Sequence, residues 1–450
     1  MNSIKRVLVA NRGEIALRII RACEKLGIES VLAVSTVDRD SLPARTATRA
    51  VCIGPGEASG SYLNVNALLS AADGRDCDAV HPGYGFLSES QTFAQACEDK
   101  GLRFVGPTSK QIGAMGNKLQ ARALAVRCGI PVLSGTERIA SLQEALAEAE
   151  RVGYPVMFKA AAGGGGRGMK IVPRQEELRS AFVAASNESR SAFGDDTLYL
   201  ERYVSNARHV EVQILGDGKG HVVHLGDRDC SVQRRHQKLI EEAPAPFLSE
   251  ELHTRIFAAA LKLGREMSYR SAGTVEFLVD ADAEAFYFLE MNTRIQVEHP
   301  VTEMVTGIDL VEQQLRIAAG EGLQLDQADI TCRGHSIECR INAEDPDRGF
   351  APSPGVLLRW EPPAGAHIRL DSHCTTGYKV PPHYDSLLGK LIVTSDTRDS
   401  ALDLMGQALA GFAVEGIHTT IPFLRRVVGD ERFSGGQINT RLLDALLVKT

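Results

Sequence analysis

The chain has 450 residues, of which 44% are apolar and 24% charged, with a formal net charge of −7. A chain of this length exceeds what one hydrophobic core usually supports, so two to four structural units are expected. The charge excludes a broad basic surface for nucleic acid or membrane, and no segment approaches the roughly 18 uninterrupted apolar residues of a membrane span. Nine cysteines without a Cys-x-x-Cys pair predict reduced thiols in a cytoplasmic protein.

The first third of the sequence alternates strand-like and helix-like segments. Residues 6–10 are mostly apolar, and Ile15, Ile19, Cys23 and Leu26 recur at helical spacing before Gly27. This pattern predicts a buried strand and a helix that ends at the glycine. Further strand-like runs, at 30–35, 50–53, 78–81 and 103–105, alternate with helical stretches such as 65–72 and 92–100. Such alternation predicts a doubly wound α/β unit, whose ligand cleft lies at the carboxyl ends of the strands.

A glycine-rich segment follows a predicted helix at residues 118–128. One strand-like run ends at Lys159, glycines occupy positions 163–166 and 168, and a second strand-like run starts at Met169. A Rossmann turn would open a helix here, and a Walker loop would contain Gly-Lys-Ser/Thr, so neither motif fits. The arrangement predicts a hairpin whose backbone N–H groups close over phosphates, with Lys159 as a positive charge beneath. The alternative is a flexible solvent loop.

The next segments are predicted strands with polar side chains. Residues 197–204 form a strand that runs into a connector, and such connectors often present backbone amide groups to an adenine. Residues 208–213 and 221–225 alternate polar and apolar side chains, which predicts strands with one exposed face. The cation-rich run at 227–238 contains Gln233, His236 and Lys238 at close spacing, which favours an anion site over a merely solvated face.

The most informative stretch covers residues 286–298. From Glu290 to Glu298 every second residue is polar, so these side chains would share one face of an extended strand. A straight strand would hold those two glutamates about 26 Å apart, so joint action requires a bend after Asn292. The preceding run, 273–280, predicts an antiparallel hairpin partner that carries Glu276. Glu276, Glu290 and Asn292 would then be hard oxygen ligands for Mg²⁺ or Mn²⁺, the alternative being acids on a solvated sheet face.

The last third predicts a smaller α+β unit after a helix at residues 308–319. Strands are expected near 337–341 and 356–360, and a rigid loop at 380–386 leads into a strand at 390–394. Two helices, at 400–410 and 419–428, are expected to complete the chain.

Five motifs in this order resemble those of biotin carboxylase, a family of the ATP-grasp superfamily. They are VANRGEIA at 9–16, HPGYGFLSE at 81–89, QRRHQK at 233–238, EMNTRIQVEHP at 290–300 and ECRINAE at 338–344. The resemblance, which runs from about residue 6 to residue 436, implies three domains. These are a doubly wound pre-ATP-grasp domain at 1–115, an ATP-grasp domain at 116–330 with a mobile glycine-rich lid at about 132–203, and a C-terminal α+β biotin carboxylase domain at 331–450.

The resemblance also implies a nucleotide site between two β-rich lobes. Its metal positions, for two ions of Mg²⁺ or Mn²⁺, are Glu276, Glu290 and Asn292. The ATP-binding residues that it implies are Lys118, Lys159, Gly163, Gly164, Gly165, Gly166, Gly168, Glu201, Arg202, Tyr203, Val204, His209, Gln233, His236, Glu276, Leu278 and Glu290.

For bicarbonate, the family pattern implies Lys238, Arg294, Gln296 and the backbone N–H of Val297. It assigns Glu298 as the general base that removes the bicarbonate proton during attack on the γ-phosphoryl group, which gives carboxyphosphate. A free glutamate has a pKa of about 4.3, which is weak for this task, so burial or coupling to phosphoryl transfer must help. Arg340 is implied as the group that binds biotin and stabilises its enolate, with a purely structural cation as the alternative.

The sequence departs from the family pattern at several positions. Ala162 shortens the glycine run, Arg202 replaces a common lysine, and residues 374–379 and His383 differ from the usual apolar and aromatic choices. Arg21 stands where relatives have dimer contacts, with Lys25 where an acid would suit. A homodimer is therefore expected, though with an altered contact.

The chain contains no Met-Lys-Met biotinyl motif and no carboxyltransferase region, so a separate biotin carboxyl carrier protein and carboxyltransferase subunits are the expected partners. The resemblance implies the first half-reaction of an acyl-CoA carboxylase, acetyl-CoA above all, in fatty acid biosynthesis. Two alternatives remain open at this point. One is another ATP-grasp ligase that joins an acyl phosphate to an amine, and the other is a nucleotide-binding regulatory protein without turnover.

Overall fold

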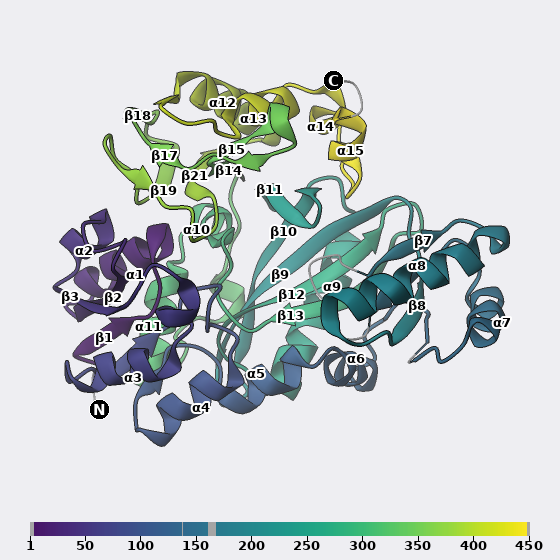
Figure 1. Cartoon of the computed structure of the whole chain (residues 1–450), viewed down its shortest axis with the longest axis horizontal. Helices are drawn as coiled ribbons and strands as arrows, with labels where there is room; N and C mark the ends of the chain where they lie inside the picture. The colour runs from purple at the N-terminus through teal and green to yellow at the C-terminus, as the bar shows by residue number, and fades with distance from the viewer. Residues whose placement is uncertain (1–3, 137, 161–167, 448–450) are drawn as a thin grey trace.

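The computed structural model describes residues 4–136, 138–160 and 168–447. Figure 1 shows the N-terminal elements at one side, the long central strands in the middle, and the C-terminal elements above them. A smaller lobe with α7 and α8 extends from the opposite side of the central strands. Within the described residues, no helix combines the length and apolarity that a bilayer crossing needs.

The N-terminal sheet is parallel and has the strand order β3-β2-β1-β4-β5. The doubly wound prediction is therefore confirmed for this unit. Gly27, with φ +69°, follows the first helix at the position where a left-handed residue ends it, as predicted. The strands are β1 Arg6–Val9, β2 Glu29–Ser35, β3 Arg49–Gly54, β4 Ala79–His81 and β5 Arg103–Phe104. The helices are α1 Gly13–Lys25, α2 Leu42–Thr46, η1 Ala58–Gly60, α3 Val65–Asp73, α4 Gln91–Asp99 and α5 Ser109–Gly116.

A three-stranded antiparallel sheet with the order β7-β6-β8 forms the small lobe. Its strands are β6 Val156–Ala160, β7 Lys170–Val172 and β8 Leu198–Arg202, and its helices are α7 Leu142–Val152 and α8 Gln175–Phe193. The helix α6 Lys118–Arg127 precedes the lobe and packs against β13. A strand, and not a helix, follows the glycine run, so the hairpin prediction is confirmed for the flanking strands. The glycines 163–166 themselves lie outside the described residues.

One antiparallel sheet of eight strands, with the order β13-β12-β9-β10-β11-β14-β21-β19, forms the centre of the molecule. Pairing of β11 with β14 joins the strands of the predicted ATP-grasp unit to those of the C-terminal unit. The sheet is therefore continuous across the two units. Its strands are β9 Ala207–Asp217, β10 Val222–Arg234, β11 Gln237–Ala243, β12 Arg270–Asp280, β13 Ala285–Asn292, β14 His335–Asn342, β19 Ile368–Ser372 and β21 Leu387–Ser395.

The prediction of an exposed face on β9 and β10 is wrong. Nearly every residue of these strands is buried, because they occupy the middle of the sheet and are covered on both faces. The polar side chains of the alternating pattern are satisfied by each other: Arg228 contacts Glu211 at 2.6 Å and Gln213 at 2.9 Å. The same alternation that is typical of a solvated face thus marks a buried polar layer here.

The remaining helices cover the central sheet and close the C-terminal unit. They are α9 Glu250–Glu266, α10 His299–Thr306, α11 Leu310–Ala319, α12 Arg398–Gly411, α13 Ile421–Val428, α14 Glu431–Ser434 and α15 Leu442–Leu447, with η2 Gln327–Asp329 and η3 Pro346–Arg348. Short strands add β15 Glu344–Asp345, β16 Ala351–Pro352, β17 Gly355–Val356, β18 Arg359–Glu361, β20 Lys379–Val380 and β22 Ala413–Glu415.

Two details of the C-terminal prediction are wrong. The strand expected near 356–360 is split into β17 and β18, which pair with different partners, β20 and β22. The chain also continues past α13 into α14 and α15, both too short to show a clear helical period in the sequence.

Candidate active site

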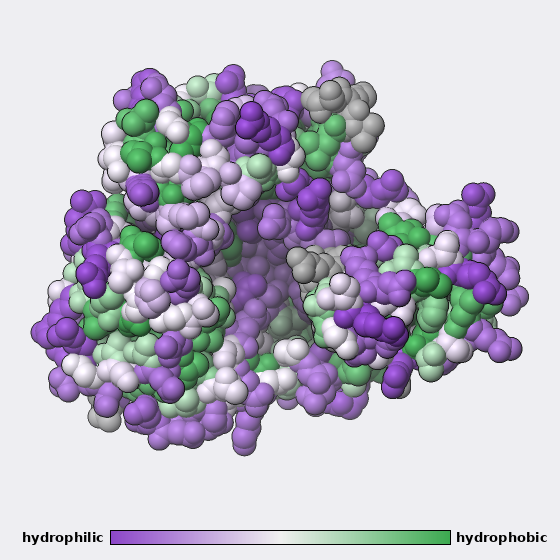
Figure 2. All heavy atoms as spheres, viewed as in Figure 1, coloured by the Kyte–Doolittle hydropathy of each residue, from purple (hydrophilic) through white to green (hydrophobic). Residues whose placement is uncertain are grey.

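The space-filling view has a deep hollow between the N-terminal and C-terminal regions on one side and the small lobe on the other (Figure 2). Its visible walls are mostly hydrophilic, whereas apolar patches lie on the outer surfaces. The central strands pass behind this hollow in the same view (Figure 1). The side chains predicted from the sequence are carried by these strands and by the turn that follows β13.

The hairpin of β12 and β13 brings the two predicted metal acids together. Glu276 and Glu290 are direct partners across the hairpin, and Asn292 lies opposite Thr274. The Asn292 Nδ2 atom donates to Glu276 Oε1 at 2.8 Å. The strand ends at Asn292 and the chain turns into α10, so the predicted hairpin and the predicted bend are both confirmed.

Lys238 lies at the centre of a buried group of three carboxylates. Its Nζ atom is 2.6 Å from Glu211, 3.1 Å from Glu276 and 2.6 Å from Glu298. Burial alone would lower the pKa of Lys238, but these three negative charges raise it well above the usual value. Sequence reasoning missed Glu211 as a site residue, although it stands in the alternating polar pattern of β9, because that pattern is equally typical of a solvated face.

Glu298 is wholly buried and contacts two cations. Besides Lys238, its carboxylate accepts from Arg340 Nη2 at 3.0 Å, and Arg340 Nε also donates to Glu241 at 2.6 Å. Burial would raise the pKa of Glu298, but Lys238, Arg340 and Arg228 outweigh it and lower the pKa below the usual range. Burial therefore does not make Glu298 a stronger base, because its surroundings are cationic, and of the two expected aids coupling to phosphoryl transfer remains.

Arg294 is held in place by residues from two regions. Its Nε atom donates to Glu89 Oε2 at 2.8 Å, and Nη2 donates to Asn292 Oδ1 at 3.0 Å. Gln296 Nε2 donates to Glu276 Oε1 at 2.9 Å, so Gln296 also faces the carboxylate group. Sequence reasoning missed Glu89 as a functional residue, although it ends the HPGYGFLSE motif. Its role depends on a contact across about 200 positions that spacing does not reveal.

Lys159 is paired with Glu201 on the neighbouring strand. The Nζ to Oε2 distance is 2.6 Å, and Arg122 Nη1 lies 3.3 Å from the other oxygen of the same carboxylate. Lys118 starts α6 with an exposed side chain. Burial and the charge of Glu276 raise the pKa of Glu290, and the charge of Lys118 opposes that rise. Both lysines thus lie where a triphosphate could exchange for their carboxylate neighbours.

The connector after β8 offers fewer free amide groups than predicted. The N–H of Arg202 donates to Ser134 and the N–H of Tyr203 to Pro155, at 2.8 and 2.9 Å. These two amides are therefore engaged within the protein. Val204 belongs instead to a small apolar cluster, and its other members are Leu133, Ala207, Leu278 and Tyr287. Such a surface suits the face of an adenine ring, which keeps Val204 and Leu278 as candidates.

The two histidines of the predicted nucleotide site lie on β9 and in the turn between β10 and β11. His209 Nε2 is 3.2 Å from Glu276 Oε2, and although burial opposes it, Glu276 raises the pKa of His209. His236 lies in the hairpin turn with φ +66° and an exposed side chain. Gln233 is the cross-strand partner of Lys238. Gly168, the one described glycine of the run at 163–168, adopts φ +72°, and its N–H donates to Glu188.

The carboxylates fit a hard divalent cation. Glu290 and Glu276 are cross-strand partners, one exposed and the other buried, and the charge of Glu276 raises the pKa of Glu290. Two unit charges 4 Å apart repel by about 4 kcal/mol at an effective dielectric of 20, so a cation between them is favourable. Asn292 fits less directly, because its Oδ1 atom accepts from Arg294. The ligand atoms of His209, Glu211 and Glu276 also lie within 4.8 Å of one another, in the space that the Lys238 ammonium reaches.

Three family models match successive parts of the chain. The model of the biotin carboxylase N-terminal domain matches residues 3–112. The model of the carbamoyl-phosphate synthase L chain ATP-binding domain matches residues 117–326, and that of the biotin carboxylase C-terminal domain matches residues 338–445.

Related sequences align with this chain over nearly its whole length. A biotin carboxylase of Nostoc sp. is 49% identical over 98% of this chain and 99% of its own length. Biotin carboxylase 1 of Bacillus subtilis is 48% identical, with 98% of each chain covered. A pyruvate carboxylase subunit of Methanothermobacter thermautotrophicus is 47% identical over 98% of this chain and 89% of its own.

Solved structures agree with the sequence comparisons. A biotin carboxylase from Campylobacter jejuni in a β,γ-ATP complex superposes with a TM-score of 0.94 and 45% identity, over 98% of this chain and 99% of its own. The biotin carboxylase domain dimer of Hydrogenobacter thermophilus 2-oxoglutarate carboxylase, in complex with MgADP, ADP and bicarbonate, has a TM-score of 0.93 and 46% identity, over 99% and 98%.

Proposed function

The chain belongs to the biotin carboxylase family, and we propose from this premise that it carboxylates biotin on a separate carrier protein, with ATP and bicarbonate as co-substrates. Biotin carboxylase activity is the activity of this family, and it makes the protein an ATP-dependent ligase. The regulatory protein without turnover and the other ATP-grasp ligase are therefore set aside. The products are N1-carboxybiotin, ADP and phosphate, formed through carboxyphosphate.

The observation that carries the proposed site is the continuous set of contacts from Glu276 through Lys238 and Glu298 to Arg340. It links the acids suited to a metal–phosphate complex with the cations suited to a small anion. Glu276 and Glu290 would hold Mg²⁺ or Mn²⁺, which would neutralise the phosphate oxygens of ATP when bound. Lys118 and Lys159 bind the phosphates, and Val204 and Leu278 pack on the adenine.

Bicarbonate binds between Lys238 and Arg294, whose planar guanidinium matches two oxygens of the anion. Gln296 and the N–H of Val297 complete the site. Glu298 accepts the bicarbonate proton while a bicarbonate oxygen forms a bond to the γ-phosphorus and ADP leaves. Because its pKa is lowered, Glu298 is ionised at neutral pH but a weak base, so proton transfer is coupled to phosphoryl transfer.

The C–O bond of carboxyphosphate then breaks to give CO₂ and phosphate, the phosphate takes the N1 proton of biotin, and N1 forms a bond to the carbon of CO₂. Arg340 stabilises the negative charge that develops on the ureido oxygen of biotin. Its contact with Glu298 brings the activation of bicarbonate and the carboxylation of biotin into one site. The carboxylated biotin leaves with its carrier protein.

For the final acceptor we propose acetyl-CoA, with a biotin carboxyl carrier protein and carboxyltransferase subunits as partners in fatty acid biosynthesis. The relatives that are named biotin carboxylase support this choice. The relative that is a pyruvate carboxylase subunit makes pyruvate the competing acceptor. We further propose a cytoplasmic homodimer. The location is supported by the nine cysteines, which are all free thiols. The homodimer is supported by Arg21 on α1, whose side chain is exposed, whereas Lys25 pairs with Glu312 of its own chain at 2.7 Å.

Release of ADP from Mg-ATP tests this function when bicarbonate and free biotin are omitted in turn. The proposal predicts turnover that depends on bicarbonate and rises with biotin. Turnover that is indifferent to both compounds would reject it. Purified carrier proteins from an acetyl-CoA carboxylase and from a pyruvate carboxylase, offered as alternative substrates, then discriminate between the two acceptors.

A further inference from the structure

Lys390 is a wholly buried lysine behind the turn that carries Glu298. It stands on β21 in the C-terminal part of the sheet, opposite Arg340 of β14. Its Nζ atom donates to the backbone oxygen of Val297 at 2.9 Å and contacts Glu14 Oε1 at 3.1 Å. One ammonium group therefore joins the active-site turn to strand β21 and to helix α1 of the N-terminal unit.

The contact with Val297 fixes the peptide group that precedes Glu298. The carbonyl of Val297 and the N–H of Glu298 belong to the same plane, so a hydrogen bond to this carbonyl limits rotation on both sides of it. His299 Nδ1 contacts the Gln296 oxygen at 2.8 Å one peptide earlier in the turn. Two hydrogen bonds to backbone carbonyls thus hold the orientation of the turn.

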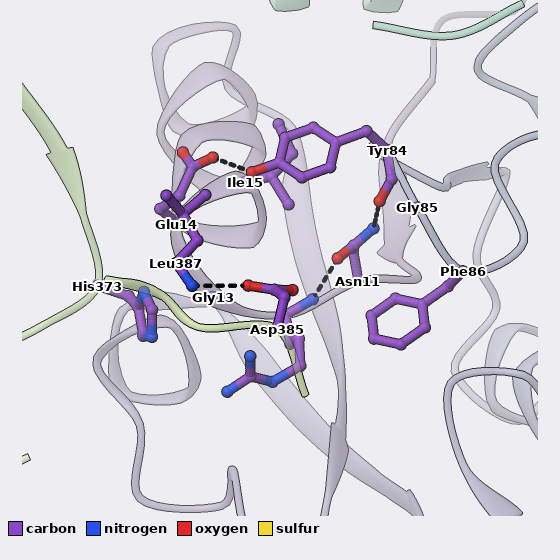
Figure 3. Close-up of a pocket in the computed structure, with 11 residues that line it drawn as sticks. Asn11, Gly13, Glu14, Ile15, Tyr84, Gly85, Phe86, His373, Asp385 and Leu387 are labelled. Carbon is purple, nitrogen blue, oxygen red and sulfur yellow. Dashed lines mark hydrogen bonds between the residues drawn. The ribbon is translucent and has the colours of Figure 1, made fainter. Parts of the chain in front are cut away.

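Glu14 holds the other side of the Lys390 ammonium group. Figure 3 shows Glu14 and Tyr84 pointing toward each other, and the Tyr84 hydroxyl donates to Glu14 Oε1. Glu14 is buried and Tyr84 half-buried, and both line a small pocket of about 110 Å³. Burial raises the pKa of Glu14, and Lys390 counteracts that rise.

Two explanations of Lys390 make different predictions. In one, Lys390 only neutralises buried carboxylates, as a structural cation does. Asp371, 3.8 Å away, already has a two-point ion pair with Arg369, so Glu14 is the ion-pair partner that depends on Lys390. The charge of Lys390 also acts on the buried Glu338, whose pKa it lowers against the effect of burial. In the other, the hydrogen bond from Lys390 to the Val297 carbonyl orients the turn that carries Glu298.

We propose that Lys390 is a positioning residue for the carboxylation reaction, which orients the Val297–Glu298 peptide by its hydrogen bond to the Val297 carbonyl. The inference rests on the proposed roles of Val297 and Glu298 at bicarbonate. It needs no contact between Lys390 and any substrate. A displacement of about 1 Å in reacting groups can reduce a rate by about 100-fold, so a contact of this kind has a measurable effect.

The test compares Lys390→Met, Glu14→Gln and the double variant with the wild type in bicarbonate-dependent ADP release. Lys390→Met removes the hydrogen bond and also leaves Glu14 without its cation, which can destabilise the fold. The double variant removes the same hydrogen bond but removes the Glu14 charge together with its cation, so it stays informative if the single variant fails to fold. Thermal midpoints and KM values for ATP are measured for every variant.

We expect the double variant to recover the thermal midpoint of the wild type while its kcat stays about 10- to 100-fold lower, with KM for ATP unchanged. Glu14→Gln alone is expected to keep the wild-type rate. A double variant with wild-type kcat would overturn the inference, because charge balance would then explain Lys390. A wild type whose ADP release ignores bicarbonate would instead overturn the proposed function itself.

Discussion

Lys238 and Glu298 form a buried ion pair, with Nζ 2.6 Å from Oε1, inside the group of residues proposed to bind bicarbonate. The lysine is thus the partner of the proposed base before any anion arrives. A bound bicarbonate would share this cation with Glu298, so anion binding and activation of the base are coupled. The ion pair also keeps Glu298 ionised, because the cations around it lower its pKa despite burial.

Glu298→Gln is predicted to lose most bicarbonate-dependent ADP release while ATP binding persists. The amide keeps the shape of the side chain, but its single oxygen can accept from only one of Lys238 and Arg340 in the observed geometry, and the amide cannot take a proton. A positioned general base typically contributes 10²- to 10⁴-fold, and we expect a loss in about that range. Steady-state kinetics and nucleotide titration measure the two effects. Glu312→Gln, on the outer helix α11, is the matched control, and a fully active Glu298→Gln variant would remove the proposed base.

Arg340→Ala is predicted to reduce biotin carboxylation far more than bicarbonate-dependent ATP cleavage. The guanidinium is assigned to the biotin step, whereas Lys238 and Arg294 serve the bicarbonate step. The two rates are measured as carboxybiotin formed and as ADP released without biotin. Arg316→Ala, which breaks a partly exposed ion pair worth about 0–1 kcal/mol, controls for general loss of an arginine. Equal losses in both rates would contradict the separate role of Arg340.

Glu290→Gln is predicted to weaken the binding of Mg²⁺ without harming the metal-free fold. The substitution removes one of two facing carboxylates, so we expect the half-saturating Mg²⁺ concentration to rise by about tenfold or more, where tenfold is about 1.4 kcal/mol. Without metal, the variant should unfold at the same temperature as the wild type or higher, because repulsion from Glu276 is relieved. Glu284→Gln, in the connector of the same hairpin, is the control. An unchanged Mg²⁺ requirement would exclude Glu290 as a ligand.

Glu241 is predicted to make stability depend on pH. Burial, opposed by Arg340, raises its pKa from 4.5 to about 7. Between these values the folded state binds more protons than the unfolded chain, so the free energy of unfolding falls as pH rises toward 7, by at most about 1.4 kcal/mol per unit. Glu241→Gln cannot ionise and should lack this slope.

Denaturant titrations of the wild type and Glu241→Gln at several pH values from about 5 to 8 measure this difference. The advantage of the variant should grow with pH and become constant above about 7. The neighbouring charged groups Glu298, Glu338 and Arg340 are present in both proteins, but Glu338 also loses the repulsion of Glu241 in the variant. A difference that does not change with pH would show that Glu241 titrates normally in the fold.

Much of the fold was predictable because local patterns and tertiary structure agree. The stripe of Ile15, Ile19 and Cys23 indicated helix α1, and the polar connector after Asp280 indicated the β12–β13 hairpin. The strands β9 and β10 were predicted, but their burial was not. A polar alternation has the same period whether water or buried ion pairs satisfy it, and only the tertiary partners decide between these cases.

The candidate site was predictable where one short segment carries several polar groups. Glu290, Asn292 and Glu298 fall on one such segment, and its bend follows from the distance that a straight strand would impose. Glu211 and Lys390 could not be assigned in this way, because each acts through contacts with distant segments. The sequences of β9 and β21 have the residue pattern of any sheet strand, and only the tertiary contacts of Glu211 and Lys390 reveal their roles.

Transfer of labelled bicarbonate carbon to biotin tests the central claim most directly. The protein is incubated with Mg-ATP, ¹⁴C-bicarbonate and biotin, and acid-labile carboxybiotin is counted for the wild type and for Glu298→Gln. The proposed mechanism predicts label on biotin in the wild type, in equal amount to the ADP released, and little in the variant. ATP cleavage by the wild type without any label on biotin would contradict it.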